Sequence, residues 1–163
     1  MSELQDILGA VYRKEFSALE KLTPEEVNLR DQDGRTPLMH AVLAEDADPA
    51  IVKLLLKKGA DIHATDSDQK WTALHFAARD QKEEIVRTLL EAGASVDPVD
   101  VFGVTPLWRS VFHSGSKQSG AIKELVEHGA DPFKKNTSGV APIDLARQSG
   151  WNEIVAFLEG KVH

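Results

Sequence analysis

The residues best suited to catalysis in this chain lack the spacing that catalysis requires. The segment from Gly115 to Gly120 has the outer spacing of a phosphate-binding loop, which needs a lysine and a hydroxyl residue directly after it to bind phosphate and magnesium. Ala121 and Ile122 occupy these two positions. The motif therefore fails where its chemistry would be carried out.

The histidines and carboxylates also form no reactive pattern. The chain has no HExxH motif, no nucleophile elbow and no pair of histidines at i, i+4, which makes a zinc site improbable. The six histidines are His40, His63, His75, His113, His128 and His163. Glu83 and Glu84 are expected on the solvated face of a helix, where a general acid would lack burial, so we interpret them as capping acids. We expect no catalytic residue, no metal and no cofactor.

A repeated phrase organises the chain instead. It begins at Thr36 (TPLMHA), Thr72 (TALHFAA), Thr105 (TPLWRSV) and, in a degraded form, Ala141 (APIDLAR). Each copy is followed by an apolar helix pattern that ends in glycine, as in IVKLLLKKGAD, IVRTLLEAGAS, IKELVEHGAD and IVAFLEG. The copies begin about 33 to 36 residues apart, a period that indicates a stacked repeat protein.

Local physical chemistry explains both halves of the repeat. The hydroxyl of Thr36 can cap a helix, and Pro37 suits the first helical turn, where its missing N–H costs nothing. The first helix carries small apolar residues at i, i+3 and i+4, whereas the second carries bulkier ones and supplies most of the buried volume. Glycine then ends each second helix in a left-handed conformation; these stops are Gly59, Gly93 and Gly129.

Three elements recur in fixed order, a TPLH-like start, an apolar second helix and a GAD-like ending. From about residue 28 to the C-terminus this order resembles the ankyrin repeat family. The resemblance implies an all-α solenoid of stacked helix-turn-helix units joined by projecting β-hairpin loops. We expect one domain over 1–163, with N-terminal capping helices in 1–30 and a C-terminal capping repeat in 135–163. The internal repeats are expected at 31–65, 66–99 and 100–134.

Both ends depart from the repeat pattern. Ser2 and Gln5 are spaced as a capping box for a first helix, and a second helix is expected from Glu15 to Leu22. Terminal units of a stack need a polar outer face because only one neighbour covers them. At the other end, Lys161 and His163 are expected to solvate the last unit.

The resemblance also implies where a partner would bind, because the family uses hairpin tips and the concave face of the first helices. The residues assigned to this surface are Asp33, Arg35, Asp68, Trp71, Arg79, Phe102, Val104, Trp108, Arg109, Phe112 and His113. Aromatic residues and arginine concentrate binding energy at interfaces, which favours a site in the second and third repeats. Alternatives remain open: Trp108 could simply fill volume, and Trp71 and Phe102 could fold back onto neighbouring hairpins.

Charge favours a basic protein partner over a nucleic acid. The net charge is −7, and residues 24–68 hold 5 basic and 10 acidic residues, whereas residues 102–163 hold 7 and 6. An acidic field attracts basic partners, and nucleic-acid binding would need a basic stripe. A net charge of this size also serves solubility, which is the alternative explanation.

We therefore predict a non-catalytic protein-protein interaction module that is a monomer when unbound. The alternative is a free-standing intracellular inhibitor, such as a bacterial immunity protein that neutralises a basic toxin or enzyme. No apolar run approaches the roughly 20 residues that span a bilayer, and the start SELQD lacks the features of a secretory signal. With zero cysteines, these features suggest no membrane partner and a cytoplasmic location.

Overall fold

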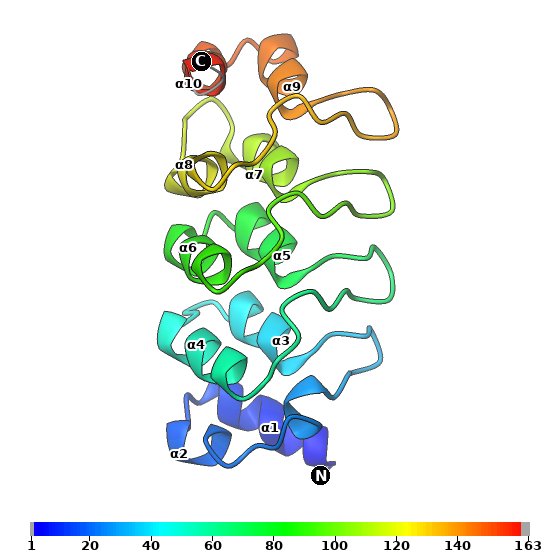
Figure 1. Cartoon of the computed structure of the whole chain (residues 1–163), viewed down its shortest axis with the longest axis vertical. Helices are drawn as coiled ribbons and strands as arrows, with labels where there is room; N and C mark the ends of the chain where they lie inside the picture. Colours follow the sequence, from blue (N-terminus) through cyan, green and yellow to red (C-terminus); the bar gives the residue numbers. More distant parts are fainter. Residues whose placement is uncertain (1, 161–163) are drawn as a thin grey trace.

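Helix pairs follow one another along a single axis, with the two chain ends at opposite ends of the stack (Figure 1). The structure is a computed structural model that describes residues 2–160. The predicted ends Lys161 and His163 lie outside the described residues. The helices are α1 (Glu3–Tyr12), α2 (Phe16–Leu19), the 3-10 helix η1 (Glu26–Asn28), α3 (Pro37–Leu43), α4 (Pro49–Lys57), α5 (Ala73–Arg79), α6 (Glu83–Glu91), α7 (Pro106–Ser114), α8 (Gly120–Glu127), α9 (Pro142–Gln148) and α10 (Asn152–Gly160). The predicted all-α solenoid is confirmed.

The repeated phrases begin the first helices as predicted. The hydroxyl oxygens of Thr36, Thr72 and Thr105 accept hydrogen bonds from the N–H groups three residues later, at 3.4, 3.4 and 3.2 Å. Ala141 has no hydroxyl, and the helix start is instead bridged by the carboxylate of Asp144, which accepts from the Ala141 N–H at 3.1 Å. The capping box of Ser2 and Gln5 is also present.

The second helix is shorter than predicted. It covers Phe16–Leu19 rather than residues 15–22. The N–H groups of Lys21 and Leu22 donate to carbonyls three residues back, at 3.2 Å each, so the chain tightens out of the α-helix before Pro24. Proline also disfavours helical geometry in the residue before it, which helps to end the segment.

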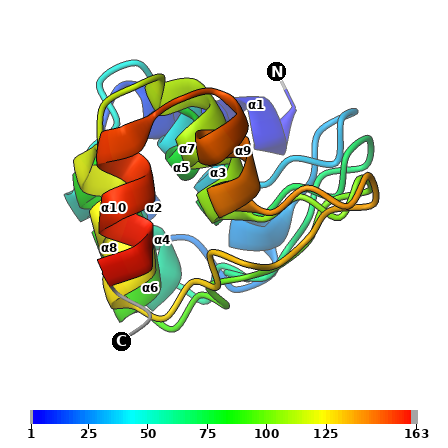
Figure 2. The same cartoon turned by 90° about the horizontal axis from the view of Figure 1, so that it is seen from above.

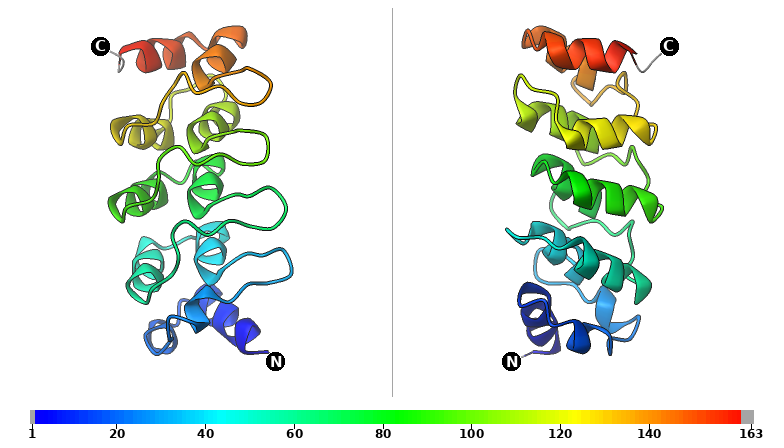
Figure 3. Two further views of the ribbon diagram at one scale, coloured as in Figure 1. Left: turned by 45° about the vertical axis from the view of Figure 1, so that its right-hand side comes forward. Right: turned by 90° about the vertical axis from the view of Figure 1, so that its left-hand side faces the viewer.

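Two columns of helices run along the stack (Figure 3), and buried apolar side chains from both columns form one continuous core. Helices α3, α5, α7 and α9 form one column, and α4, α6, α8 and α10 form the other. Leu38, Leu74 and Leu107 from the first column are almost completely buried, as are Leu55 and Leu89 from the second. Each such side chain contributes about 2 kcal/mol by leaving water. Every unit therefore depends on its neighbours for part of its core.

The connecting loops project together to one side of the helices (Figure 2). Within residues 2–160 none of them forms a β-strand, so the implied hairpins exist as turns rather than as paired strands. In each loop the side-chain Oδ1 of one Asp or Asn accepts hydrogen bonds from two backbone N–H groups and so closes the turn. These residues are Asp31, Asp66, Asp100 and Asn136. Side-chain turns of this kind are typical of Asp and Asn.

Backbone hydrogen bonds also link each loop tip to the next. The N–H of Ser67 donates to Asp33 O at 2.8 Å, that of Val101 to Gln69 O at 3.0 Å, and that of Thr137 to Phe102 O at 3.0 Å. The second loop is one residue longer than the others, counted from Asp66 to Thr72, and Lys70 there adopts a φ of 61°, close to the 70° of Gly103. The tips therefore form one connected edge.

Candidate protein-binding site

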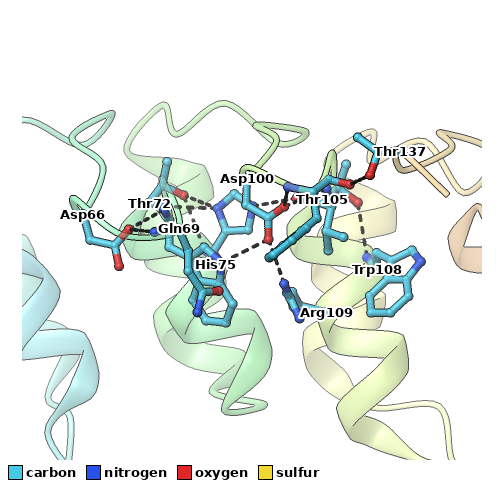
Figure 4. Close-up of polar contacts among 12 residues, drawn as sticks. Asp66, Gln69, Thr72, His75, Asp100, Thr105, Trp108, Arg109 and Thr137 are labelled. Carbon is cyan, nitrogen blue, oxygen red and sulfur yellow. Dashed lines mark hydrogen bonds and ion pairs between the residues drawn. The ribbon is translucent and has the colours of Figure 1, made fainter.

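The buried carboxylate of Asp100 holds the third loop against two repeats (Figure 4). Its Oδ1 accepts the N–H groups of Phe102 and Val104 at 2.8 and 3.0 Å. Its Oδ2 accepts from the indole N–H of Trp71 at 3.0 Å and from Arg109 Nη2 at 2.8 Å. Burial alone would raise the pKa of this carboxyl, but the hydrogen bonds from Arg109 and the two N–H groups outweigh burial and lower the pKa. Asp100 is therefore a charged anchor at neutral pH.

Arginine side chains cover the aromatic rings beside this anchor. The guanidinium carbon of Arg109 lies 4.7 Å from the Trp71 ring centroid and 5.7 Å from that of Trp108. Arg79 lies 5.4 Å from the Trp71 ring and makes two hydrogen bonds to the Asp80 carboxylate, at 2.7 and 3.0 Å. Cation-π contacts of this kind contribute about 0.5 to 2 kcal/mol each. These contacts hold the arginine and tryptophan side chains in place on the face formed by α5 and α7.

Two of the predicted contact residues are buried. Trp71 is only 5% exposed, so its interpretation as an exposed tip anchor is wrong, and the alternative that it folds back is the correct one. The reason is that its indole N–H reaches Asp100 in the next loop. Val104 is buried as well, and its carbonyl accepts the Nε2–H of His75 at 3.0 Å. These two residues support the surface from below.

Other predicted residues remain on the surface. Phe102 is 56% exposed at the tip of the third loop, so folding back does not apply to it, and Phe112 is 50% exposed on α7. His113 is exposed next to Phe112, with ring centroids 5.1 Å apart. Asp33 and Asp68 are exposed at the first two tips. Arg35 is half-buried, with its guanidinium carbon 5.6 Å from the Phe76 ring.

Trp108 combines both of the roles considered for it. It is half-buried, and its ring stacks on Phe112 at a centroid distance of 5.3 Å and an angle of 14°. Its indole nitrogen is buried and has no hydrogen-bond partner in the described part of the chain. His75, at the same place in the preceding copy, instead bonds to both Thr72 and Val104. Trp108 therefore fills volume while it supports the exposed ring of Phe112.

The sequence did not single out two features of this face. Asp100 was not among the predicted site residues, although the recurrence of Asp or Asn at the same loop position, as in Asp31, Asp66 and Asn136, was a visible signal. A hydrogen-bonded chain also joins three elements: the Tyr12 hydroxyl donates to His40 Nδ1 at 2.8 Å, and His40 Nε2–H donates to Asp31 at 2.7 Å. Tyr12 is the single tyrosine of the sequence and belongs to no repeated pattern, so the sequence did not indicate this chain of hydrogen bonds. Within residues 2–160, no group of His, Asp and Glu side chains gathers that could hold a metal ion.

Stacked helix pairs with linked, projecting loops define a helical-repeat protein whose loops and first helices form a continuous face. The model of the family of ankyrin repeats, three copies long, matches residues 7–100 and 42–136. The chain therefore belongs to the ankyrin-repeat family.

Known relatives share the repeats over a small part of their length. The chain is 40% identical to Inversin of Mus musculus over 132 residues, covering 78% of this chain and 12% of that protein. It is 34% identical to Tyrosine-protein kinase Shark of Drosophila melanogaster over 130 residues, covering 79% and 13%. It is 33% identical to Neurogenic locus notch homolog protein 1 of Homo sapiens over 134 residues, covering 74% and 5%.

These matches support a general protein-binding role, because ankyrin repeats are generally interaction modules without catalytic activity. The chain spans 13% or less of the three relatives, so the similarity concerns a repeat segment only. Among the described helices, none is long and apolar enough to cross a membrane.

Proposed function

We propose that this protein is a non-catalytic module that binds a partner protein through its loop tips and the face of α5 and α7. The observation that carries the proposal is the exposure of Phe102, whose turn is closed by Asp100, and of Phe112, whose ring stacks on Trp108. Rings of this kind are the usual anchors of interfaces, and rigid support lowers the entropy that binding must remove. Asp33, Asp68 and Arg79 form the polar surroundings in the first two loops and on α5.

Isolation of a partner with the full chain, followed by calorimetry on the purified pair, tests the assignment. Phe102→Ala and Phe112→Ala should each weaken binding by about 2 kcal/mol, roughly 30-fold, because hot-spot aromatics dominate affinity. Phe133→Ala is the matched control, since Phe133 is 45% exposed but lies outside the proposed surface. Unchanged affinity in both test variants would remove the proposed site.

A second candidate function is an inhibitor, such as an immunity protein, that neutralises a basic toxin or enzyme in the cytoplasm as a monomer. The acidic residues of the first internal repeat favour it, since Asp33 in the first loop and Glu45 and Asp46 between α3 and α4 are exposed. Part of this charge is already neutralised, because Asp46 pairs with Lys14 at 2.7 Å and Asp33 with Arg35 at 3.5 Å. An inhibitor of this kind should associate more slowly as salt rises, by about tenfold or more. Salt-independent association would argue against steering by these loops.

A further inference from the structure

The N-terminal end of the stack contains an apolar groove that the proposed binding face does not use. It has a volume of about 430 Å³ and lies between α1 and the segment that follows it. Ile7 and Ala10 contribute from α1, and Ala18, Leu19 and Leu22 from α2 and the turn after it. Ala18 is exposed, so the groove opens to solvent.

The second helix of this first unit is short, which leaves less helix beside α1 than the later units have beside their first helices. Helix α2 has four residues, whereas the second helices α4, α6 and α10 have nine and α8 has eight. At 1.5 Å per residue, the first unit lacks about 7 Å of the helix that completes the other units. Figure 1 shows α2 as a single short turn beside α1.

Acidic side chains surround the apolar floor. Glu3 and Asp6 lie in the first turn of α1, and Glu26 lies in η1. Within residues 2–160, none of the three forms an ion pair with lysine or arginine. Lys58 acts electrostatically on Glu26 and Arg13 on Asp6, but neither forms an ion pair with that carboxylate, so the carboxylates of the rim outnumber the cations near them.

The Glu26 carboxylate is charged at neutral pH. It accepts the N–H of Thr23 at 2.6 Å, and this hydrogen bond is the main reason why its pKa is lowered. Carboxyl groups from α1 and η1 beside an apolar floor favour a ligand that is apolar on one side and positive at its edges.

We propose that this groove binds a basic amphipathic helix of a partner protein. Its apolar stripe would lie on Ile7, Ala18 and Leu22, and its lysine or arginine residues would pair with Glu3, Asp6 and Glu26. Helix-in-groove recognition uses this combination of apolar anchors and charged edges. The site lies at the blue end of the stack in Figure 1, whereas Phe102 and Phe112 belong to the green third repeat. It is therefore a second surface, independent of the proposed loop-and-helix site.

Nuclear magnetic resonance of the full, isotope-labelled chain tests the proposal with a synthetic peptide. The probe is a leucine–lysine amphipathic helix of about 18 residues, long enough to be helical when it binds. Amide shifts should be confined to α1, α2 and η1. A leucine–glutamate peptide with the same apolar stripe is the matched probe and should bind at least about tenfold more weakly. Equal binding of both peptides, or shifts centred on Phe102 and Phe112, would overturn the proposal.

Two variants in the groove, each with a control variant on α10, separate binding to the groove from general attraction to acidic surfaces. Ala18→Arg places a positive side chain in the groove and should weaken the leucine–lysine peptide about tenfold, whereas Ala156→Arg on α10 should change it less than about twofold. Both alanines are exposed, so both variants should keep the wild-type unfolding temperature. Glu3→Gln should weaken binding and reduce its salt dependence, and Glu153→Gln, in the first turn of α10, is its control. If the variants on α10 weakened peptide binding as much as the variants in the groove, the proposed binding site would be contradicted.

Discussion

Asp100 connects loop geometry to the candidate surface because a single carboxylate satisfies donors from both sides. Two backbone N–H groups set the turn below Phe102, and the side chains of Trp71 and Arg109 tie the turn to the second repeat and to α7. A buried carboxylate is tolerated only when it is paired and hydrogen-bonded in this way. The position of Phe102 therefore depends on a buried carboxylate and on the side chains that donate to it.

Removal of one of these donors should be measurable as lost stability. Trp71→Phe keeps an aromatic ring but loses the N–H that donates to Asp100, and we expect the free energy of unfolding to fall by about 2 kcal/mol. Urea unfolding followed by circular dichroism measures the change. Phe102→Leu, at an exposed position, should stay within about 0.5 kcal/mol of the wild type. A Trp71→Phe protein as stable as the wild type would show that the hydrogen bond contributes little.

Residue types alone could not separate Trp71 from Phe102. Both are aromatic residues in loops just ahead of a repeated phrase, yet one is buried and the other is exposed. The difference arises from their places in the loop, since Trp71 directly precedes Thr72 as the buried Val104 precedes Thr105, and from a contact of Trp71 to Asp100, 29 residues away. Local patterns hold no information on such a contact. The repeated threonines, by contrast, cap their helices through neighbours three residues away, and these helix starts were predicted correctly.

At the scale of the elements, one histidine joins a helix to the loop of the next repeat. His75 in α5 accepts the N–H of Thr72 at 3.2 Å and donates to Val104 O at 3.0 Å. Burial lowers the pKa of this imidazole, and the bond to Val104 opposes burial only in part. The neutral ring is therefore the form that links the second and third units.

This linkage predicts a loss of stability in mild acid. The unfolded chain, with a histidine pKa near 6.5, takes up the proton first, so folding stability is complete above about pH 7 and falls as the pH decreases toward the folded pKa. The slope should approach about 1.4 kcal/mol per pH unit for this single group. Urea titrations between pH 7.5 and about 5 measure it. His75→Gln should lose most of the slope, whereas His63→Gln, at an exposed position, should keep it; equal slopes in both would refute the assignment.

Across the whole molecule, each unit is held by its neighbours, so the ends differ from the middle. Leu89 in α6 and Leu158 in α10 are both fully buried. Helix α6 packs between α4 and α8, whereas α10 packs mainly on α9 of its own unit. Stability of such stacks is a sum of units and interfaces, and terminal units unfold locally.

The same substitution at these two sites should therefore give different patterns of hydrogen exchange. Leu89→Ala should cost about 2 to 5 kcal/mol and reduce amide protection across the neighbouring units. Leu158→Ala should remove protection from α9 and α10 and leave α5 and α6 nearly unchanged. Mass-spectrometric hydrogen exchange compares the two. A uniform loss of protection in both variants would mean that the stack unfolds only as one unit.

The chain of hydrogen bonds from tip to tip has one more consequence. Thr137 donates to the Phe102 carbonyl through both its N–H and its hydroxyl, each at 3.0 Å. The position of the exposed Phe102 ring is therefore set in part by the repeat that follows it. A substitution in one turn therefore alters the contacts offered by the turn beside it. Selectivity for a ligand is a shared property of adjoining modules, and swapping a single module would change the surface of two.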